Sequence, residues 1–365
     1  MIEHDELAAW LRLLETPGVG RVTARRLLAA FGSPQAVLAA STGARREVVD
    51  PGPADALADE PETLAALVAA TVEWLASGSE PRHVVTLGDP LYPTALLNTE
   101  DPPLLLYLQG RAELLQASSF AIVGSRNPTP QGEDNARAFA THLSRAGLTI
   151  VSGLALGIDG EAHEGALQGP GSTVAVIGTG LDRVYPKRHL HLARRIAQHG
   201  LLVSEYPLGT PPLPENFPLR NRIIAGLARG TLVVEAALQS GSLITARLAT
   251  EAGRDVFAVP GSIHSPQSRG CHTLIKQGAK LVESAQDILE ELQPGAAAPT
   301  SPPAEASDRP EPLLEALGYE PVSLEALVAR TGWSASALNT RLLELELEGR
   351  VARLPGQLFQ RLAAG

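Results

Sequence analysis

Residues 148–167 read LTIVSGLALGIDGEAHEGAL, an apolar run that passes through glycines into a helical pattern. The residues of 148–152 are mainly apolar or β-branched and do not alternate with polar ones, which is typical of a strand covered on both faces. Similar short runs lie next to glycine elsewhere in the chain: FAIVG (120–124), TVAVIG (173–178), GLLVSE (200–205), TLVVEA (231–236), DVFAVPG (255–261) and AKLVE (279–283).

Helical patterns separate most of these runs. They cover 131–146, 159–168, 188–199, 219–229 and 242–252. Strands that alternate with helices form a parallel sheet with helices on both of its faces. The sequence therefore predicts an α/β fold, an extended Rossmann-like, doubly wound domain with a mostly parallel sheet. Ligands of such sheets bind beyond the carboxyl ends of the strands.

The regions flanking this core have their own patterns. Residues 293–311 are rich in Pro, Ala and Ser without periodicity, which predicts a linker between a core over 81–292 and a C-terminal domain over 312–365. Residues 1–80 predict an all-α domain. Within it, the turn PGVG (17–20) between two helical patterns is similar to a helix-hairpin-helix or SAM-like unit, whose turn amides can hold a DNA phosphate. The alternative is a plain helical bundle, which the acidic surroundings favour.

Composition and charge narrow the function classes. The 365 residues are 44% hydrophobic and 19% charged, enough for two or three domains. No apolar run is long enough to cross a membrane, and the acidic N-terminus lacks a signal-peptide core, so we expect a cytoplasmic protein without a membrane partner. Cys271 is the only cysteine, which excludes an intramolecular disulfide and a Cys-rich zinc site. A lone thiol of this kind is more often a packing residue than a nucleophile.

The net charge of −10 argues against a broad basic surface, but the charge is unevenly distributed. Residues 1–115 carry a net −8, residues 116–293 a net +1 and residues 294–365 a net −3. All three lysines (Lys187, Lys276 and Lys280) lie in the middle segment. An anionic partner is therefore expected to meet the middle of the chain.

Glycines and side chains that can donate hydrogen bonds follow the ends of the predicted strands. Gly124, Ser125 and Arg126 follow the first, Gly153 the second, Lys187 the third, and Ser240, Gly241 and Ser242 the fifth. Glycine at such turns lets backbone amides approach a phosphate, and the next helix N-terminus adds a favourable field. The motifs G-x-G-x-x-G and G-x-x-x-x-G-K-[ST] are absent. These donors predict an anion site, although Ser240 to Ser242 could merely cap a helix.

The stretch FPLRNRIIAGL (217–227) places Arg220 and Arg222 at a predicted helix start, where cations are disfavoured. Residues two apart on a helix diverge by about 200°, so both cannot face one phosphate if both are helical. Either Arg220 precedes the first turn, or one of the two braces the core. Pro218 favours the first alternative. Phe217 and Tyr185, close to the same rim, could stack on bases or belong to the core.

Asp159, Glu161 and His163 could form a metal or acid–base set. Because they are spaced two apart, a helix does not bring all three to one face. We therefore expect no metal site, and since no catalytic set and no cofactor motif accompany the anion donors, we expect no cofactor and no catalysis.

Five stretches together resemble the DNA-processing protein A (DprA/Smf) family over residues 82–283. They are IVGSRNPTPQG, VSGLALGIDGEAHEGAL, VIGTGLDRVYP, FPLRNRIIAGL and SGSLITARLATEAGRDVFAVPG. The resemblance implies a homodimer that binds single-stranded DNA, protects incoming DNA and loads the RecA recombinase during natural transformation, without known catalysis.

The resemblance also implies site residues. The DNA pocket would use Gly124, Ser125, Arg126, Lys187, Arg220, Asn221 and Arg222, to which the rim adds Gly153, Phe217, Ser240, Gly241 and Ser242. The dimer contact would lie in CHTLIKQGAKL (271–281), with His272, Ile275 and Leu281 as candidates and the RecA surface nearby.

Residues 323–362 fit a helix, a turn at Thr331-Gly332, a second helix from Ser334 and a hairpin, which looks like a winged helix. A DNA reader of that shape carries basic residues on its second helix. Here that helix offers Ser336, Asn339, Arg341, Glu344, Glu346 and Glu348. This acidic surface predicts weak DNA binding and contacts with protein instead, and it disfavours a sequence-specific regulator.

The alternative function is an enzyme. Nucleotide phosphoribohydrolases resemble this core in a Gly-rich second turn and in a Gly-Ser/Thr turn after a strand ending in Glu. Here VVEAALQSGS (233–242), with Glu235, occupies that place. Those enzymes carry a PGG-x-GT stretch that this chain lacks, which lowers the enzyme hypothesis.

Overall fold

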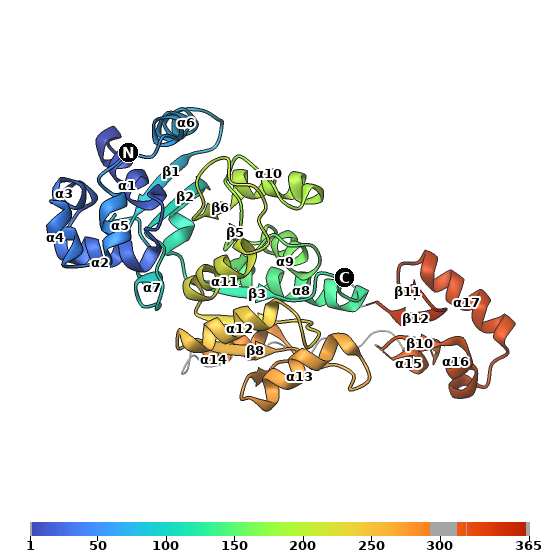
Figure 1. Ribbon diagram of the computed structural model, residues 1–365. Helices are drawn as coiled ribbons and strands as arrows, with labels where there is room; N and C mark the ends of the chain where they lie inside the picture. Colours follow the sequence, from blue (N-terminus) through green and yellow to red (C-terminus); the bar gives the residue numbers. More distant parts are fainter. Residues whose placement is uncertain (1, 293–311, 319, 363–365) are drawn as a thin grey trace.

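The computed structural model describes residues 2–292, 312–318 and 320–362. Six helices lie near the N-terminus: α1 (His4–Glu15), α2 (Arg21–Phe31), α3 (Pro34–Ala39), α4 (Thr42–Arg46), α5 (Pro51–Ala56) and α6 (Leu64–Ala76). They gather at one end of the molecule (Figure 1). Their apolar residues, Trp10 and Leu13 among them, share one buried cluster with Tyr107 and Leu202 of the central sheet. The N-terminal helices are thus packed onto the sheet rather than separate from it.

Within the described residues the central sheet has nine strands in the order β1-β2-β6-β5-β4-β3-β7-β8-β9. Their bounds are β1 (Arg82–Thr86), β2 (Leu105–Gly110), β3 (Ser119–Val123), β4 (Thr149–Ser152), β5 (Thr173–Ile177), β6 (Leu201–Ser204), β7 (Gly230–Val233), β8 (Asp255–Ala258) and β9 (Lys280–Leu281). All neighbours are parallel except β1 with β2 and β2 with β6, which are antiparallel. The predicted fold class, a mostly parallel doubly wound sheet, is confirmed.

Helices cover both faces of the sheet because each strand sends alternate residues to opposite sides. Phe120 and Ile122 of β3 pack under α8 and α9, whereas Ala121 and Val123 pack on the other face. One face carries α8 (Pro130–Arg145), α9 (Ile158–Ala166), α10 (Leu190–His199) and α14 (Ala285–Leu292). The other carries α7 (Thr94–Leu97), α11 (Asn216–Leu227), α12 (Ser242–Glu251) and α13 (Arg269–Lys276). Three short 3-10 helices complete the core: η1 (Ala112–Gln116), η2 (Lys187–His189) and η3 (Pro266–Ser268).

All seven strands and five helices predicted for the core are present, within a few residues of the expected bounds. Strands β1 and β2 were not predicted. They form an antiparallel pair whose connection holds only the short helix α7, so the alternation of strand and long helix that marks the other strands does not extend to them.

The C-terminal domain is the predicted winged helix (Figure 1, at the right). It comprises α15 (Pro312–Leu317), β10 (Val322–Ser323), α16 (Leu324–Thr331), α17 (Ala335–Leu347), β11 (Val351–Leu354) and β12 (Leu358–Arg361). Gly332 ends α16 in the left-handed conformation, φ 70°, which permits the tight turn into α17. The predicted linker, 293–311, lies outside the described residues. No helix in the described part of the chain is long and apolar enough to cross a membrane.

Candidate functional site

A cavity of about 480 Å³ opens at the carboxyl edge of the sheet, between β3 and β7. The chain leaves β3 to build β4, β5 and β6 on one side, then returns through α11 to place β7 on the other. Such a switch in strand order leaves a crevice between the two strand ends. The cavity is lined by residues that follow β3, β4 and β7 and by the starts of α11 and α12. The topology therefore creates a cavity at the edge where the strand-end pattern placed the predicted anion site.

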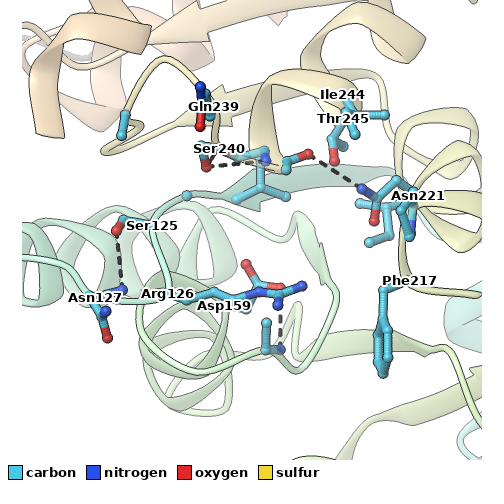
Figure 2. A pocket seen from close by; sticks show the side chains of 18 of the residues that line it. Ser125, Arg126, Asn127, Asp159, Phe217, Asn221, Gln239, Ser240, Ile244 and Thr245 are labelled. Carbon is cyan, nitrogen blue, oxygen red and sulfur yellow. Dashed lines mark hydrogen bonds between the residues drawn. The ribbon is translucent and has the colours of Figure 1, made fainter. Parts of the chain in front are cut away.

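Nine of the twelve predicted DNA-contacting residues line this cavity: Gly124, Ser125, Arg126, Phe217, Arg220, Asn221, Ser240, Gly241 and Ser242. Gly153 lines a smaller cavity beside it, of about 70 Å³, which shares Arg126, Phe217 and Arg220 with the first. Lys187 and Arg222 line neither of the two. Figure 2 shows Ser125, Arg126 and Asn127 on one side of the main cavity, Gln239, Ser240 and Thr245 on another, and Phe217 at its end.

Arg126 is the exposed cation of this pocket. It has no hydrogen-bond or ion-pair partner within the described residues, although its loop is well held. The Ser125 hydroxyl accepts a hydrogen bond from the Asn127 amide (3.1 Å), and Gln267 Nε2 donates to the Asn127 carbonyl (3.0 Å). A fixed loop that presents an unpaired guanidinium is suited to bind an anion.

Close packing below this loop requires glycine at 124. A Cβ on Gly124 would lie 2.6 Å from Ile158 Cγ1 and 3.0 Å from the Glu235 carbonyl oxygen. Those distances are shorter than side-chain contacts allow, so the strand end would have to move. Glycine here lets the loop after β3 pack against α9 and the end of β7.

Helix α11 begins at Asn216, three residues earlier than predicted, and this corrects the expectation for Arg220. Pro218 lies in the first turn, where its missing N–H would have no partner anyway, so it does not delay the helix. Both Arg220 and Arg222 are therefore helical, and their side chains diverge. The hypothesis that Pro218 keeps Arg220 at the boundary is wrong.

Arg220 braces the floor of the pocket. Its side chain is buried (4% exposed), and Nη1 donates hydrogen bonds to the carbonyls of Gly153 (2.6 Å) and Val176. Burial lowers the pKa of Arg220 to about 10, an effect that the Asp159 carboxylate opposes. The residue thus stays cationic at neutral pH and ties β4 and β5 to α11.

Asp159 balances the charge of Arg220 from below. Its Oδ2 accepts hydrogen bonds from the amides of Gly153 (3.1 Å) and Ala155 (3.3 Å). Burial raises the pKa of Asp159, while Arg220 and the two amides oppose that rise. Arginine, carboxylate and loop form one buried unit under the exposed Arg126.

Arg222 points away from the cavity and into a network of charges. Its Nε donates to Asp101 Oδ2 (2.9 Å) and its Nη2 to Glu205 Oε1 (2.6 Å). Asp101 also accepts from Arg21 (2.8 Å) and Arg25 (2.5 Å) of α2. We call these five residues the Asp101 network. The sequence left two alternatives: Arg220 precedes the first turn, or one of the two arginines braces the core. The second is correct, and both Arg220 and Arg222 make such structural contacts.

The start of α12 presents the Ser240-Gly241-Ser242 turn to the cavity. The helix begins at Ser242 and has no acidic residue in its first turn, so its positive end is uncompensated there. Ser240 Oγ accepts a hydrogen bond from the Ser242 amide (3.3 Å) and lies 2.7 Å from Ser242 Oγ. The N-cap residue of α12, Gly241, supplies no side-chain cap, and Ser240 satisfies one amide at the helix start while the turn faces the cavity.

Two aromatic rings meet at the boundary of the main and the smaller cavity. The rings of Tyr185 and Phe217 lie 5.4 Å apart and are tilted at 44°. Tyr185 is 49% exposed, and Phe217 is half-buried and lines both cavities. Neither belongs to the buried core, so both are accessible for stacking.

The set of Asp159, Glu161 and His163 is split by the helix as predicted. Glu161 pairs with Arg137, and His163 is buried between the Leu154 amide, which donates to Nε2 (3.2 Å), and Thr173 Oγ1 (2.7 Å from Nδ1). Across the described residues, no group of three or more His, Cys, Asp or Glu side chains is arranged to hold a metal ion.

His163 predicts an acid-sensitive fold. Burial lowers its pKa to about 3, against 6.5 when unfolded, so between these values only the unfolded chain binds the proton. The contribution of His163 to the free energy of unfolding is therefore fully present above pH 6.5 and is lost as the pH falls below it. Wild type is expected to lose about 2 kcal/mol more than His163→Gln between pH 7 and pH 5, measured by urea unfolding. Equal losses in both proteins would contradict this.

Two further candidates, Glu235 and Cys271, lie outside the pocket. Glu235, which the enzyme hypothesis needs, accepts hydrogen bonds from the amide (2.9 Å) and hydroxyl (2.6 Å) of Thr129 at the start of α8 and does not line the cavity. Cys271 is buried, and burial raises the pKa of its thiol to about 12, in keeping with a packing role.

The proposed dimer residues lie on α13 and the edge strand β9. His272 Nε2 is 2.9 Å from the Gly261 carbonyl oxygen, Ile275 is half-buried and Leu281 is 51% exposed. Their role in dimerisation stays a prediction.

Several lining residues were not predicted, notably Asn127, Gln239, Thr245 and Gln267. Asn127, Gln239 and Thr245 belong to stretches already quoted for their arginine and serine neighbours. Gln267 comes from the loop after β8, the strand next to β7. Because the carboxyl ends of parallel strands share one edge, residues after the predicted strand at 255–261 could have been expected at this cavity.

The family model described as DNA recombination-mediator protein A matches residues 83–293. The chain belongs to this family. Models for a DprA-like N-terminal HHH domain and a DprA winged helix domain match 4–60 and 296–357. The DprA/Smf resemblance inferred from the five stretches is confirmed.

Relatives of this DprA/Smf chain cover most of its length. Protein Smf of Escherichia coli is 48% identical over 75% of this chain and 76% of its own. The X-ray structure of DprA from Streptococcus pneumoniae aligns with a TM-score of 0.67 and 39% identity over 78% of this chain and 97% of that one. A Helicobacter pylori DprA structure, described for its single-stranded DNA binding mode, aligns with a TM-score of 0.53 and 33% identity over 58% of this chain and 95% of that one.

Proposed function

We propose that this protein binds single-stranded DNA in the cavity between β3 and β7. The observation that carries the proposal is the exposed, unpaired Arg126 facing the uncompensated start of α12 across that cavity. A phosphate between them would meet a guanidinium on one side and the positive end of a helix on the other. The Helicobacter pylori relative, whose structure is described for its single-stranded DNA binding mode, supports the same ligand class.

The aromatic edge favours a single strand over a duplex. Tyr185 and Phe217 offer ring faces at the boundary of the pocket, and stacking on them requires an unpaired base. Bases of a duplex are paired and stacked inside the helix, so a duplex would leave only phosphate contacts. Few cations line the pocket, so each subunit is proposed to hold only a few nucleotides.

The remaining predictions for the family enter here as proposals. A homodimer through His272, Ile275 and Leu281 would bring two such pockets together and raise avidity by effective concentration. The protein would protect incoming single strands in the cytoplasm and load RecA onto them during natural transformation. The winged helix, whose second helix is acidic, would contact protein. We propose no catalysis, because the one carboxylate that the enzyme hypothesis requires, Glu235, is engaged by Thr129.

Arg126→Ala tests the pocket directly. The variant is expected to weaken binding of single-stranded DNA by about tenfold or more, because it removes a charge-assisted phosphate contact. Arg145→Ala is the matched control, since Arg145 is an exposed cation at the last residue of α8 and does not line the cavity. Fluorescence anisotropy with single-stranded and duplex oligonucleotides gives both affinities. Equal wild-type affinities for the two DNA forms, or an Arg126→Ala variant that binds like wild type, would refute the assignment.

A further inference from the structure

A basic surface lies outside the pocket, on η2 and α10. Residues 181–200 contain five Lys or Arg and one carboxylate, Asp182, in a chain whose net charge is −10. Two of the five cations have partners: Arg183 pairs with Asp182 (3.4 Å) and Arg195 with Glu164 (2.7 Å). The other three are Lys187, Arg188 and Arg194. All three are exposed, and none has a hydrogen-bond or ion-pair partner within the described residues.

The unpaired cations form one stripe along the helix. Arg188, His191 and Arg194 are spaced three apart, and all three are exposed. The opposite face of α10 is buried against the sheet through Leu192 and Ile196. We call Tyr185, Lys187, Arg188, His191 and Arg194 the α10 track.

The α10 track begins at the pocket. The smaller cavity, which shares Arg126, Phe217 and Arg220 with the main one, is also lined by Tyr185 and Pro186, which directly precede Lys187. His189 Nδ1 lies 3.0 Å from the Leu154 carbonyl oxygen and so fixes η2 to the loop after β4. An aromatic residue thus stands at the junction between the pocket and an unpaired basic stripe.

We propose that a single strand leaving the pocket passes over Tyr185 and continues along α10, with its phosphates on Lys187, Arg188 and Arg194. This extends the proposed DNA-binding function and rests on it. Stacking aromatics beside a row of unpaired cations are the two parts of a single-strand surface. An acidic protein would also be attracted to the stripe, but the stripe adjoins the proposed DNA pocket, and this favours one ligand that occupies both.

The double variant Arg188→Ala/Arg194→Ala tests the track. Both residues are exposed and alanine is the best helix former, so α10 is expected to fold normally. The matched control is Arg26→Ala/Arg145→Ala, which removes the same charge from two exposed positions elsewhere. Anisotropy is measured with oligothymidines of about four nucleotides, which fill only the pocket, and about fifteen, which reach the track.

The track variant is expected to bind the short oligonucleotide like wild type and the long one about tenfold more weakly. The slope of log affinity against log salt for the long oligonucleotide should decrease by about 1.4, because two phosphate contacts are lost. Long-oligonucleotide binding like wild type, or an equal loss for both lengths, overturns the track. The pocket is judged separately, since Arg126→Ala must weaken both lengths. If it weakens neither, the proposed function fails, whatever the track variant does.

Discussion

Arg220→Met is expected to lower the free energy of unfolding by about 3–5 kcal/mol, because it removes buried charge-assisted hydrogen bonds to two carbonyls and the positive charge near buried Asp159. Arg220 is 4% exposed and holds the carbonyls of Gly153 and Val176. Asp159, beneath it, is buried as well and would keep its amide partners but lose the nearby positive charge. Methionine fills part of the space but supplies neither charge nor hydrogen bonds.

A double-mutant cycle separates charge pairing from packing. Asp159→Asn keeps an acceptor for the Gly153 amide and removes the charge. The double variant Asp159→Asn/Arg220→Met should therefore lose less than the sum of the two single losses. Urea unfolding of the four proteins gives the coupling energy. A wild-type urea midpoint for Arg220→Met, with loss of DNA binding alone, would instead make Arg220 a direct phosphate contact.

DNA affinity is expected to fall together with stability in Arg220→Met. The loop after β4 carries Gly153 and Ala155 to the two cavities, and Arg220 is its main polar anchor to α11. Arg126, in contrast, has no structural partner in the described residues, so its removal should reduce affinity at unchanged stability. The two arginines that line the pocket can thus be distinguished: loss of Arg220 should lower both stability and affinity, and loss of Arg126 should lower affinity alone.

The position of the pocket could be predicted from the sequence, and the reason is geometric. Carboxyl ends of parallel strands lie at one edge, so Ser125 after β3 and Ser240 after β7 were expected at the same edge of the sheet. The pairing of β3 with β7, which the sequence did not predict, then makes them neighbours. The direction in which Arg220 and Arg222 point was harder to predict from the sequence. It depends on where α11 begins, and Pro218 is compatible with a start at 216 as well as at 219.

Partners distant in the sequence could not be predicted at all. Asp101 lies between α7 and β2, in a stretch without any motif, and it meets Arg222 where α7 packs against α11. Lys187 shows the same limit. It follows β5 as expected, but it lies at the first residue of η2 and lines neither cavity.

The Asp101 network also changes the interpretation of the N-terminal helices. Arg21 and Arg25 follow the PGVG turn and matched a phosphate-binding hairpin, yet both are engaged by Asp101. Arg26 is the exposed member of the three. Arg21 and Arg25 therefore connect the N-terminal helices to the core, while the match of residues 4–60 to an HHH domain agrees with the helix-hairpin-helix interpretation. A phosphate contact of the PGVG turn amides stays a prediction.

Arg222→Ala is expected to lower the free energy of unfolding by about 2–3 kcal/mol, because it removes the cation shared by two carboxylates. The side chains of Arg222 and Glu205 are only 11% and 10% exposed, and Glu205 would be left with Arg21 at 3.7 Å. Arg222→Lys keeps the charge but cannot bridge both carboxylates, so an intermediate loss is expected. Arg25→Ala is the matched control with the smaller effect, since Asp101 keeps Arg21 and Arg222.

Single-stranded DNA binding distinguishes this role from a phosphate contact. Under conditions where Arg222→Ala is folded, its affinity should lie within about threefold of wild type, because the side chain lines neither cavity. A variant with wild-type stability and a tenfold loss of affinity would mean that Arg222 leaves Asp101 and Glu205 to bind the strand. Together with Arg126 and Arg220, the result assigns each arginine of the region to the ligand, to the pocket floor or to the junction with the N-terminal helices.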